Sequence, residues 1–362
     1  MDSSKSIWKF DTIAQNEALT NEFKGALFEY LVAESLSNLG HPKCLCVIAP
    51  DLTNRLLLYE SWLRDHDLGL IVFMPGVAEQ VARAIREHLP EQLTGVEVVG
   101  KIAGGSGQKD LHESDLVVHT KNPQGQTEDF FIGLKLCKTN SFVNTKSGGA
   151  QTFLTRYFAA FSEAVKYQQE LNSDMERAYH MMGQNLYEET GLVAGGYEFK
   201  GYFGPEWLEA GLPELPGQLM TRARESVLQY YQIAIQSLYT RMSALSQTAP
   251  RFFSDSLYPI VGFGARNLIQ AIVFVDSKQA FDGKKQYGLN SFKIHTEEDV
   301  VMELSEMQMA PLQQAISSFE IMLKSWRLQI RMKPMNKFTV PGLKVNCSVK
   351  YDRSSGQIPH VY

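Results

Sequence analysis

Apolar residues recur with helical spacing near the N-terminus of the chain. In residues 21–39 (NEFKGALFEYLVAESLSNL) they stand at positions 23, 27, 28, 31, 32, 36 and 39, the period of an amphipathic helix, and Gly40 with Pro42 ends the pattern. Short apolar runs then alternate with a helical pattern across residues 41–105 (LCVIAP, GLIVFMP, VEVVGKI). This alternation predicts a small α/β segment.

Strand-like patterns follow in two places further along the chain. Residues 115–120 (DLVVHT) and 130–138 (FFIGLKLCK) flank the turn sequence NPQGQ and predict a hairpin. A helical pattern starts at about residue 150, runs to about 171, and is followed by mostly helical sequence to about 250. From residue 259 the segments are strand-like again (IVGFGARNLIQAIVFVD, SFKIHT, DVVMELSEM, SFEIML, LQIRMKP, LKVNCSVKY).

These patterns predict a mixed α/β (α+β overall) protein in three parts. Residues 1–175 form a core with an α/β insertion at about 41–105, residues 176–255 form a helical segment, and residues 256–362 form a β-rich basic unit. A chain of 362 residues is long enough for two domains, or for one large domain with appendages.

Composition narrows the class of protein. With 44% hydrophobic and 21% charged residues the chain is typical of a globular protein. The four cysteines do not form a disulfide framework, which favours a reducing compartment. Because the N-terminus lacks an apolar signal region and no run of 18 apolar residues occurs, we expect a soluble, cytoplasmic protein with no membrane partner. The net charge of −5 means that any site for a polyanion must be local.

Three residues could together support phosphodiester chemistry. Glu29 lies in the first helix, Asp115 opens a strand, and Lys135 lies inside the next strand, between two leucines. Carboxylates are the hard oxygen ligands that Mg²⁺ or Mn²⁺ prefers, and a nearby lysine can offset the charge that develops on a phosphate. Each also has a structural interpretation: Glu29 as a solvated helix residue, Asp115 as a strand-opening residue that Asp110 or Glu113 could replace, and Lys135 as an outward-facing charge.

The segments that carry these residues resemble the PD-(D/E)XK nuclease superfamily, which has the restriction-endonuclease-like fold. The resemblance covers about residues 21–172, through KGALFEYLVAESL, SDLVV and FFIGLKLCK. It implies a mixed sheet flanked by helices. It also implies catalytic roles for Glu29, Asp115 and Lys135, a divalent cation held by Glu29 and Asp115, and DNA, double-stranded, as the partner. Restriction, phage defence and phage DNA metabolism are all compatible with such an activity.

The sequence departs from this family at residue 133, where a glycine stands in place of the second acid. Three interpretations remain open. Glu29 supplies the missing ligand; or Glu128 or Asp129, just before the strand, reaches the cation; or the site is inactive and the chain is a nucleic-acid-binding or assembly protein that keeps the fold.

Two further regions are candidates for nucleic-acid contacts. In the first, Ser147 could cap a following helix whose N-terminus binds a phosphate, with nearby side chains donating further hydrogen bonds to that phosphate. The alternative is that the segment is an ordinary loop. The residues of this first region are Lys138, Asn144, Thr145, Lys146, Ser147 and Arg156.

The second region is residues 321–353, which carry eight basic residues against one acid, a local charge of +7. Arg331, Lys333 and Lys337 are its main candidates, and the interleaved aromatic residues would stack on bases. The alternatives are outward faces of amphipathic strands, or a surface for self-association or a protein partner.

Overall fold

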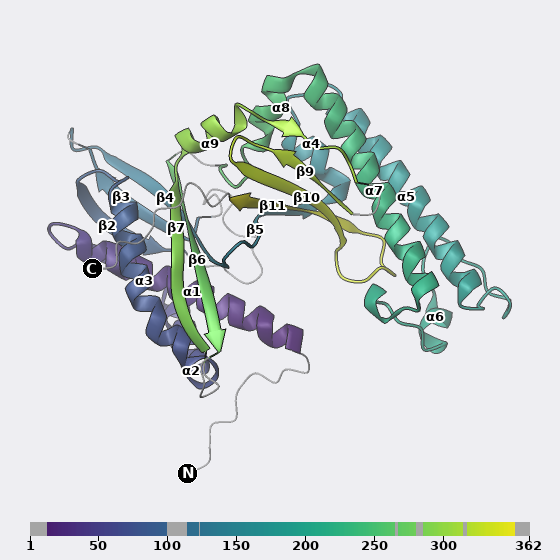
Figure 1. The fold of residues 1–362 in the computed structure, drawn as a ribbon, viewed down its shortest axis with the longest axis horizontal. Coiled ribbons are helices and arrows are strands. Elements are labelled where there is room, and N and C mark those ends of the chain that lie inside the picture. The colour runs from purple at the N-terminus through teal and green to yellow at the C-terminus, as the bar shows by residue number, and fades with distance from the viewer. Residues whose placement is uncertain are drawn as a thin grey trace, which may run out of the picture. The chain divides into compact units, whose positions relative to one another are not determined.

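The computed structural model describes residues 13–99, 114–122, 124–264, 267–279, 285–313 and 317–351. The chain divides into two compact units (Figure 1). Unit 1 is built from the described residues of Met1–Ser141 and Ala265–Glu297, and unit 2 from those of Phe142–Gly264 and Glu298–Asp352. Each unit therefore combines segments that are far apart in the sequence.

Unit 1 contains a six-stranded mixed sheet in the order β1-β2-β3-β4-β6-β7. Strands β1 and β2 are parallel, as are β4 and β6, and the other neighbouring pairs are antiparallel. The strands are β1 (Leu45–Ile48), β2 (Gln92–Val98), β3 (Leu116–Lys121), β4 (Thr127–Lys138), β6 (Leu268–Gln279) and β7 (Lys285–His295). The helices are α1 (Ile13–Leu39), α2 (Pro50–His66) and α3 (Leu68–Arg86).

The hydrophobic core of unit 1 lies between these helices and one face of the sheet. Phe28 and Val32 of α1 belong to the same buried cluster as Leu116 of β3 and as Ile132 and Leu134 of β4. Since strand residues alternate between faces, the residues between these core positions must point to the other face. The core thus decides that Gly133 and Lys135 lie away from the helices.

Unit 2 contains a five-stranded antiparallel sheet in the order β5-β11-β10-β9-β8, packed against long helices. Its strands are β5 (Val143–Gly149), β8 (Gln308–Met309), β9 (Ser318–Met322), β10 (Trp326–Pro334) and β11 (Leu343–Tyr351). Its helices are η1 (Ala150–Thr152), α4 (Phe153–Tyr157), α5 (Ala164–Glu189), α6 (Pro205–Glu209), η2 (Pro216–Gln218), α7 (Thr221–Thr248) and α8 (Pro250–Leu257). Helix α9 (Glu297–Leu304) begins at the last residue of unit 1.

The mixed α/β class predicted from the sequence is confirmed, including a sheet with parallel and antiparallel strands and a second, antiparallel sheet. The hairpin is found where the pattern predicts it, and the first helix ends at Leu39 as predicted but begins earlier, at Ile13. The division into three consecutive parts differs from the observed units, because β6 and β7 join the sheet of unit 1 and β5 pairs with β11. Chain order does not determine which strands pair.

Four local expectations were wrong. Residues 143–149 form strand β5 and not a loop, and the helix expected from about residue 150 is broken into η1, α4 and α5. The segment DVVMELSEM was expected to be a strand, but most of it lies in α9. GLIVFMP opens helix α3, which continues through an internal proline, Pro75.

Helix α3 is the one described helix that is long and apolar enough, by length and composition alone, to cross a membrane. Half of that apolar window is buried inside the structure. Its buried residues belong to the core cluster of unit 1, which is the environment of a core helix.

Candidate functional site

Asp115 lies where strands β3 and β4 separate. The pairing of the two strands ends at Leu116 and Ile132, and Asp115 comes directly before it. Its backbone N–H donates to the carbonyl of Ile132 at 2.8 Å, and its carboxylate Oδ2 accepts a hydrogen bond from the backbone N–H of Leu134 at 2.6 Å. The side chain is 4% exposed. The carboxylate is therefore buried and held in place by the backbone of β4.

Lys135 completes a buried-acid and lysine pair at this point. Its Nζ lies 3.8 Å from Asp115 Oδ2, and its side chain is 33% exposed. The Leu134 N–H and the Lys135 ammonium both contact Oδ2, and no described residue donates a hydrogen bond to Oδ1. The structure thus brings together two of the three predicted catalytic residues and leaves one carboxylate oxygen available to a ligand.

Glu29 is buried on α1, in a helix whose neighbouring residues enter the core. A Cβ added at Gly25, one turn earlier, would lie 4.0 Å from Glu29 Oε1, so this glycine borders the carboxylate. Among the described residues, Lys135 forms its ion pair with Asp115 and not with Glu29. Of the predicted set, Asp115 and Lys135 are the two residues that form a direct ion pair.

Gly133 faces a glutamine on the neighbouring strand. It pairs in register with Gln270 of β6, and a Cβ added at Gly133 would lie 3.5 Å from Gln270 Cγ, an ordinary van der Waals distance. The backbone of Gly133 does not adopt a positive φ. A larger side chain is therefore compatible with this position, and glycine is not required by the strand.

Polar residues missed in the sequence share the sheet face of Gly133 and Lys135. Gln270 pairs with His295 of β7, and Lys293 of β7 pairs with Ile272, which is opposite Lys135 on β4. Paired residues point to the same face of a sheet, and all three polar side chains are buried. Their signal in the sequence was a polar residue inside an apolar run (LIQAIVFV) and two basic residues in alternation (FKIH).

Two ionisable groups near the end of β4 are shifted by burial. Burial raises the pKa of the Cys137 thiol to about 11, although the charges of Lys135 and Lys24 oppose this. Burial also lowers the pKa of Lys24 on α1. Cys137 is therefore a neutral thiol near pH 7 and is a poor nucleophile.

The carboxylates of the described residues provide only part of a cation site. Asp115 has the correct chemistry, because its Oδ1 is a hard oxygen donor without a hydrogen bond in the described part of the chain. However, no three His, Cys, Asp or Glu side chains gather as a metal-binding group among the described residues. Asp110 and Glu113, considered above as substitutes for Asp115, lie outside the described residues.

The structure gives structural roles to most of the first group of predicted DNA contacts. Asn144, Thr145 and Ser147 lie on β5, where their side chains bond to Ser348, to the carbonyls of Ile260 and Cys347, and to Asn346. Ser147 is not a helix cap, because the residue that precedes η1 is Gly149. Lys146 is paired with Cys347 in the same sheet.

Other predicted contacts are dispersed over both units. Lys138 is at the exposed end of β4 in unit 1. In unit 2, Arg156 on α4 lies over the ring of Tyr157, and Lys337 forms an ion pair with Glu214. Arg331 and Lys333 both lie on β10.

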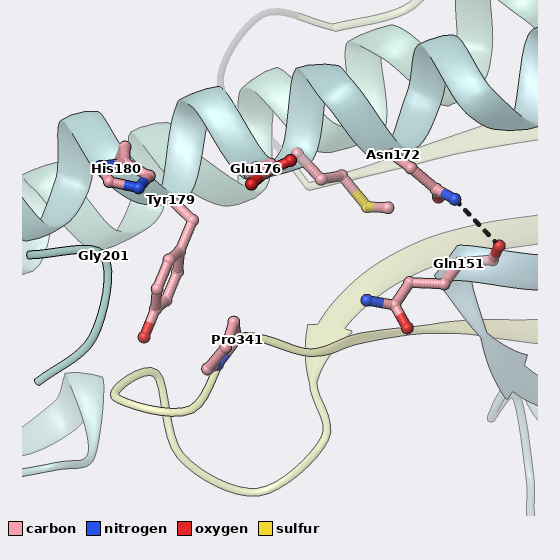
Figure 2. A pocket seen from close by; sticks show the side chains of 8 residues that line it. Gln151, Asn172, Glu176, Tyr179, His180, Gly201 and Pro341 are labelled. Atoms are coloured by element: carbon pink, nitrogen blue, oxygen red, sulfur yellow. Dashed lines mark hydrogen bonds between the residues drawn. The ribbon is translucent and has the colours of Figure 1, made fainter.

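A cavity of about 390 Å³ in unit 2 contains none of the predicted catalytic residues (Figure 2). Tyr179 of α5 lies at this cavity and donates a hydrogen bond to the carbonyl of Thr339 at 2.8 Å. Glu176 and His180 of α5 also line the cavity and contribute a carboxyl group and an imidazole ring. The lining residues are Gln151, Asn172, Met175, Glu176, Tyr179, His180, Gly201 and Pro341.

The chain matches no protein-family model and no curated protein sequence.

Proposed function

We propose that this chain is a metal-dependent deoxyribonuclease of the PD-(D/E)XK type, with Asp115 and Lys135 at its reaction centre. The observation that carries the proposal is the pair itself: a buried carboxylate at the point where two strands separate, fixed by the N–H of Leu134 and 3.8 Å from a lysine ammonium. The biological roles that we propose for this nuclease are restriction, phage defence or phage DNA metabolism.

The two side chains are suited to different parts of phosphodiester hydrolysis. Asp115 Oδ1 and Glu29 would hold Mg²⁺ or Mn²⁺, which lowers the pKa of a bound water and polarises the phosphate. The ammonium of Lys135, one-third exposed, can donate to a phosphate oxygen and offset the negative charge that develops during attack. The N–H of Leu134 fixes the Asp115 carboxylate before substrate binds, which reduces the cost of orienting it.

A nicking assay tests this function. Supercoiled plasmid is incubated with wild type, Lys135→Ala and Lys121→Ala in about 1–10 mM Mg²⁺ or Mn²⁺. This concentration exceeds the dissociation constant expected for a weak Mg²⁺ site that keeps several water ligands. Lys121, at the exposed end of β3, is the matched control. We expect Lys135→Ala to reduce the nicking rate by about 10²–10³-fold, the usual loss for one transition-state donor, and the control to retain it. Equal rates in wild type and Lys135→Ala would contradict the proposed role.

A second candidate is a non-catalytic nucleic-acid-binding or assembly protein with a nuclease-like fold. Gly133 favours it, because the second acid is missing and the described residues do not provide three metal ligands. The same assay separates the two functions: salt-dependent DNA binding without any metal-dependent nicking would support the binding protein.

A further inference from the structure

One face of the sheet in unit 2 carries a cluster of cations. On β10 and β11 apolar residues alternate with polar ones, so the apolar side chains are buried on one face and the polar side chains lie half-buried on the other. We call the basic face the cations of these two strands on the polar side: Arg327, Arg331, Lys333, Lys344 and Lys350.

The pairing register places like charges directly opposite each other. Lys333 pairs with Lys344, and Arg327 pairs with Lys350. Like charges at opposite positions destabilise a sheet. The crowding also has an electrostatic effect, since burial and the charges of Arg331 and Lys344 lower the pKa of Lys333.

Few of these charges are neutralised by the residues that the structure describes. Arg327 lies 3.7 Å from Glu320 on β9. Arg331, Lys333 and Lys344 have no acidic partner among the described residues, and Lys350 lies over the ring of Phe142. The basic face is therefore complementary in charge to an anionic ligand with several negative groups.

We propose that the basic face binds the phosphate backbone of duplex DNA. The inference rests on the proposed function only for the choice of DNA as the nucleic acid. From residue 327 to residue 333 a strand spans about 20 Å at about 3.4 Å per residue, a length that matches about six base-pair steps. Lysine and arginine along such a line contact successive phosphates.

The burial of the three predicted stacking residues favours a duplex over a single strand. The sequence suggested that Trp326, Phe338 and Tyr351 stack on bases, but all three are buried, and Trp326 packs edge-to-face on Tyr351 with ring centroids 4.9 Å apart. That expectation was wrong, and the polar-side positions of β10 and β11 carry no aromatic residue. Single-strand binding without sequence preference depends on exposed aromatic rings, whereas a duplex can be held by phosphate contacts alone.

Fluorescence anisotropy of the full chain with a labelled 24-base-pair duplex, in EDTA, tests the proposal without cleavage. The variant combines Arg331→Gln, Lys333→Gln and Lys344→Gln. The control combines Lys166→Gln, Arg177→Gln and Arg222→Gln, which remove the same charge from exposed residues of α5 and α7. Three lost phosphate contacts lower the salt slope of log K by about 2.7. Between 50 and 200 mM salt, wild type should lose about 40-fold more affinity than the variant.

Each other outcome overturns the inference. These outcomes are a variant that binds like wild type, a variant and a control that weaken equally, wild type that does not bind the duplex, and tighter binding of the single strand of the same sequence. Thermal unfolding checks that the variant folds, and its Tm should not fall because the substitutions remove like-charge repulsion. EDTA prevents metal-dependent cleavage, so the binding assay is independent of the nicking assay. Loss of nicking together with salt-dependent binding would contradict the nuclease function and would still support DNA binding by the basic face.

Discussion

Replacing Asp115 by alanine should destabilise the protein in the absence of any substrate. The substitution removes a carboxylate that accepts the N–H of Leu134 at 2.6 Å inside a buried strand junction. A hydrogen bond to a charged group contributes about 1.5–3 kcal/mol, and the orphaned N–H has no replacement partner. The ion pair with Lys135 adds little, about 0–1 kcal/mol, because that lysine is one-third exposed. The expected loss in the free energy of unfolding is therefore about 2–4 kcal/mol.

Asp115→Asn separates this structural role from the chemical one. The asparagine amide oxygen can still accept the Leu134 N–H, so the expected loss of stability is about 1 kcal/mol or less. The amide is a poor ligand for a hard cation, so nicking should be lost as completely as with alanine. The control is Asp65→Ala, on the exposed side of α2, which should change stability by less than about 0.5 kcal/mol.

Urea unfolding followed by circular dichroism measures these differences. The reasoning is refuted if Asp115→Ala is as stable as wild type, because the buried hydrogen bond would then contribute nothing. It is also refuted if Asp115→Asn is as destabilising as Asp115→Ala, because the charge and not the accepted N–H would then determine stability. A stable but inactive Asp115→Asn would support both roles.

Two further predictions concern the same sheet face. Because a Cβ at Gly133 would lie 3.5 Å from Gln270 Cγ, an ordinary contact, the Gly133→Glu variant should fold. If Glu29 supplies the missing ligand, Glu29→Gln should abolish plasmid nicking, and adding Gly133→Glu to that variant should restore part of it. A folded double variant that recovers no nicking would contradict this role of Glu29. Burial raises the pKa of Cys137 from about 9 to about 11, so the unfolded thiol ionises first, and the stability present below pH 9 is lost as the pH rises toward 11. In urea titrations from pH 8 to 10.5, wild type should lose stability relative to Cys137→Ala, and parallel curves would exclude this linkage.

Local patterns in the sequence were sufficient for the first helix and for the hairpin. The helical period up to Leu39 and the turn NPQGQ act over a few residues, and the alternation around Lys135 requires that this lysine leave the face of the core. Alternation also separates the two faces of β10, where Trp326 and Leu328 are buried and Arg327 is not. The interpretation of Trp326 as a stacking residue overlooked this pattern.

Tertiary structure alone decided which strands pair. Strand β5 lies beside β11, about 200 residues later in the chain, and β6 lies parallel to β4 after the intervening segment of unit 2. Apolar alternation determines that a segment forms a strand and which of its faces is buried, but similar strands present equivalent backbone donors and acceptors to any partner. Consequently the sequence could predict Asp115 and Lys135 on neighbouring strands, while Gln270 beside Gly133 and Lys333 opposite Lys344 depend on long-range pairing that no local pattern encodes.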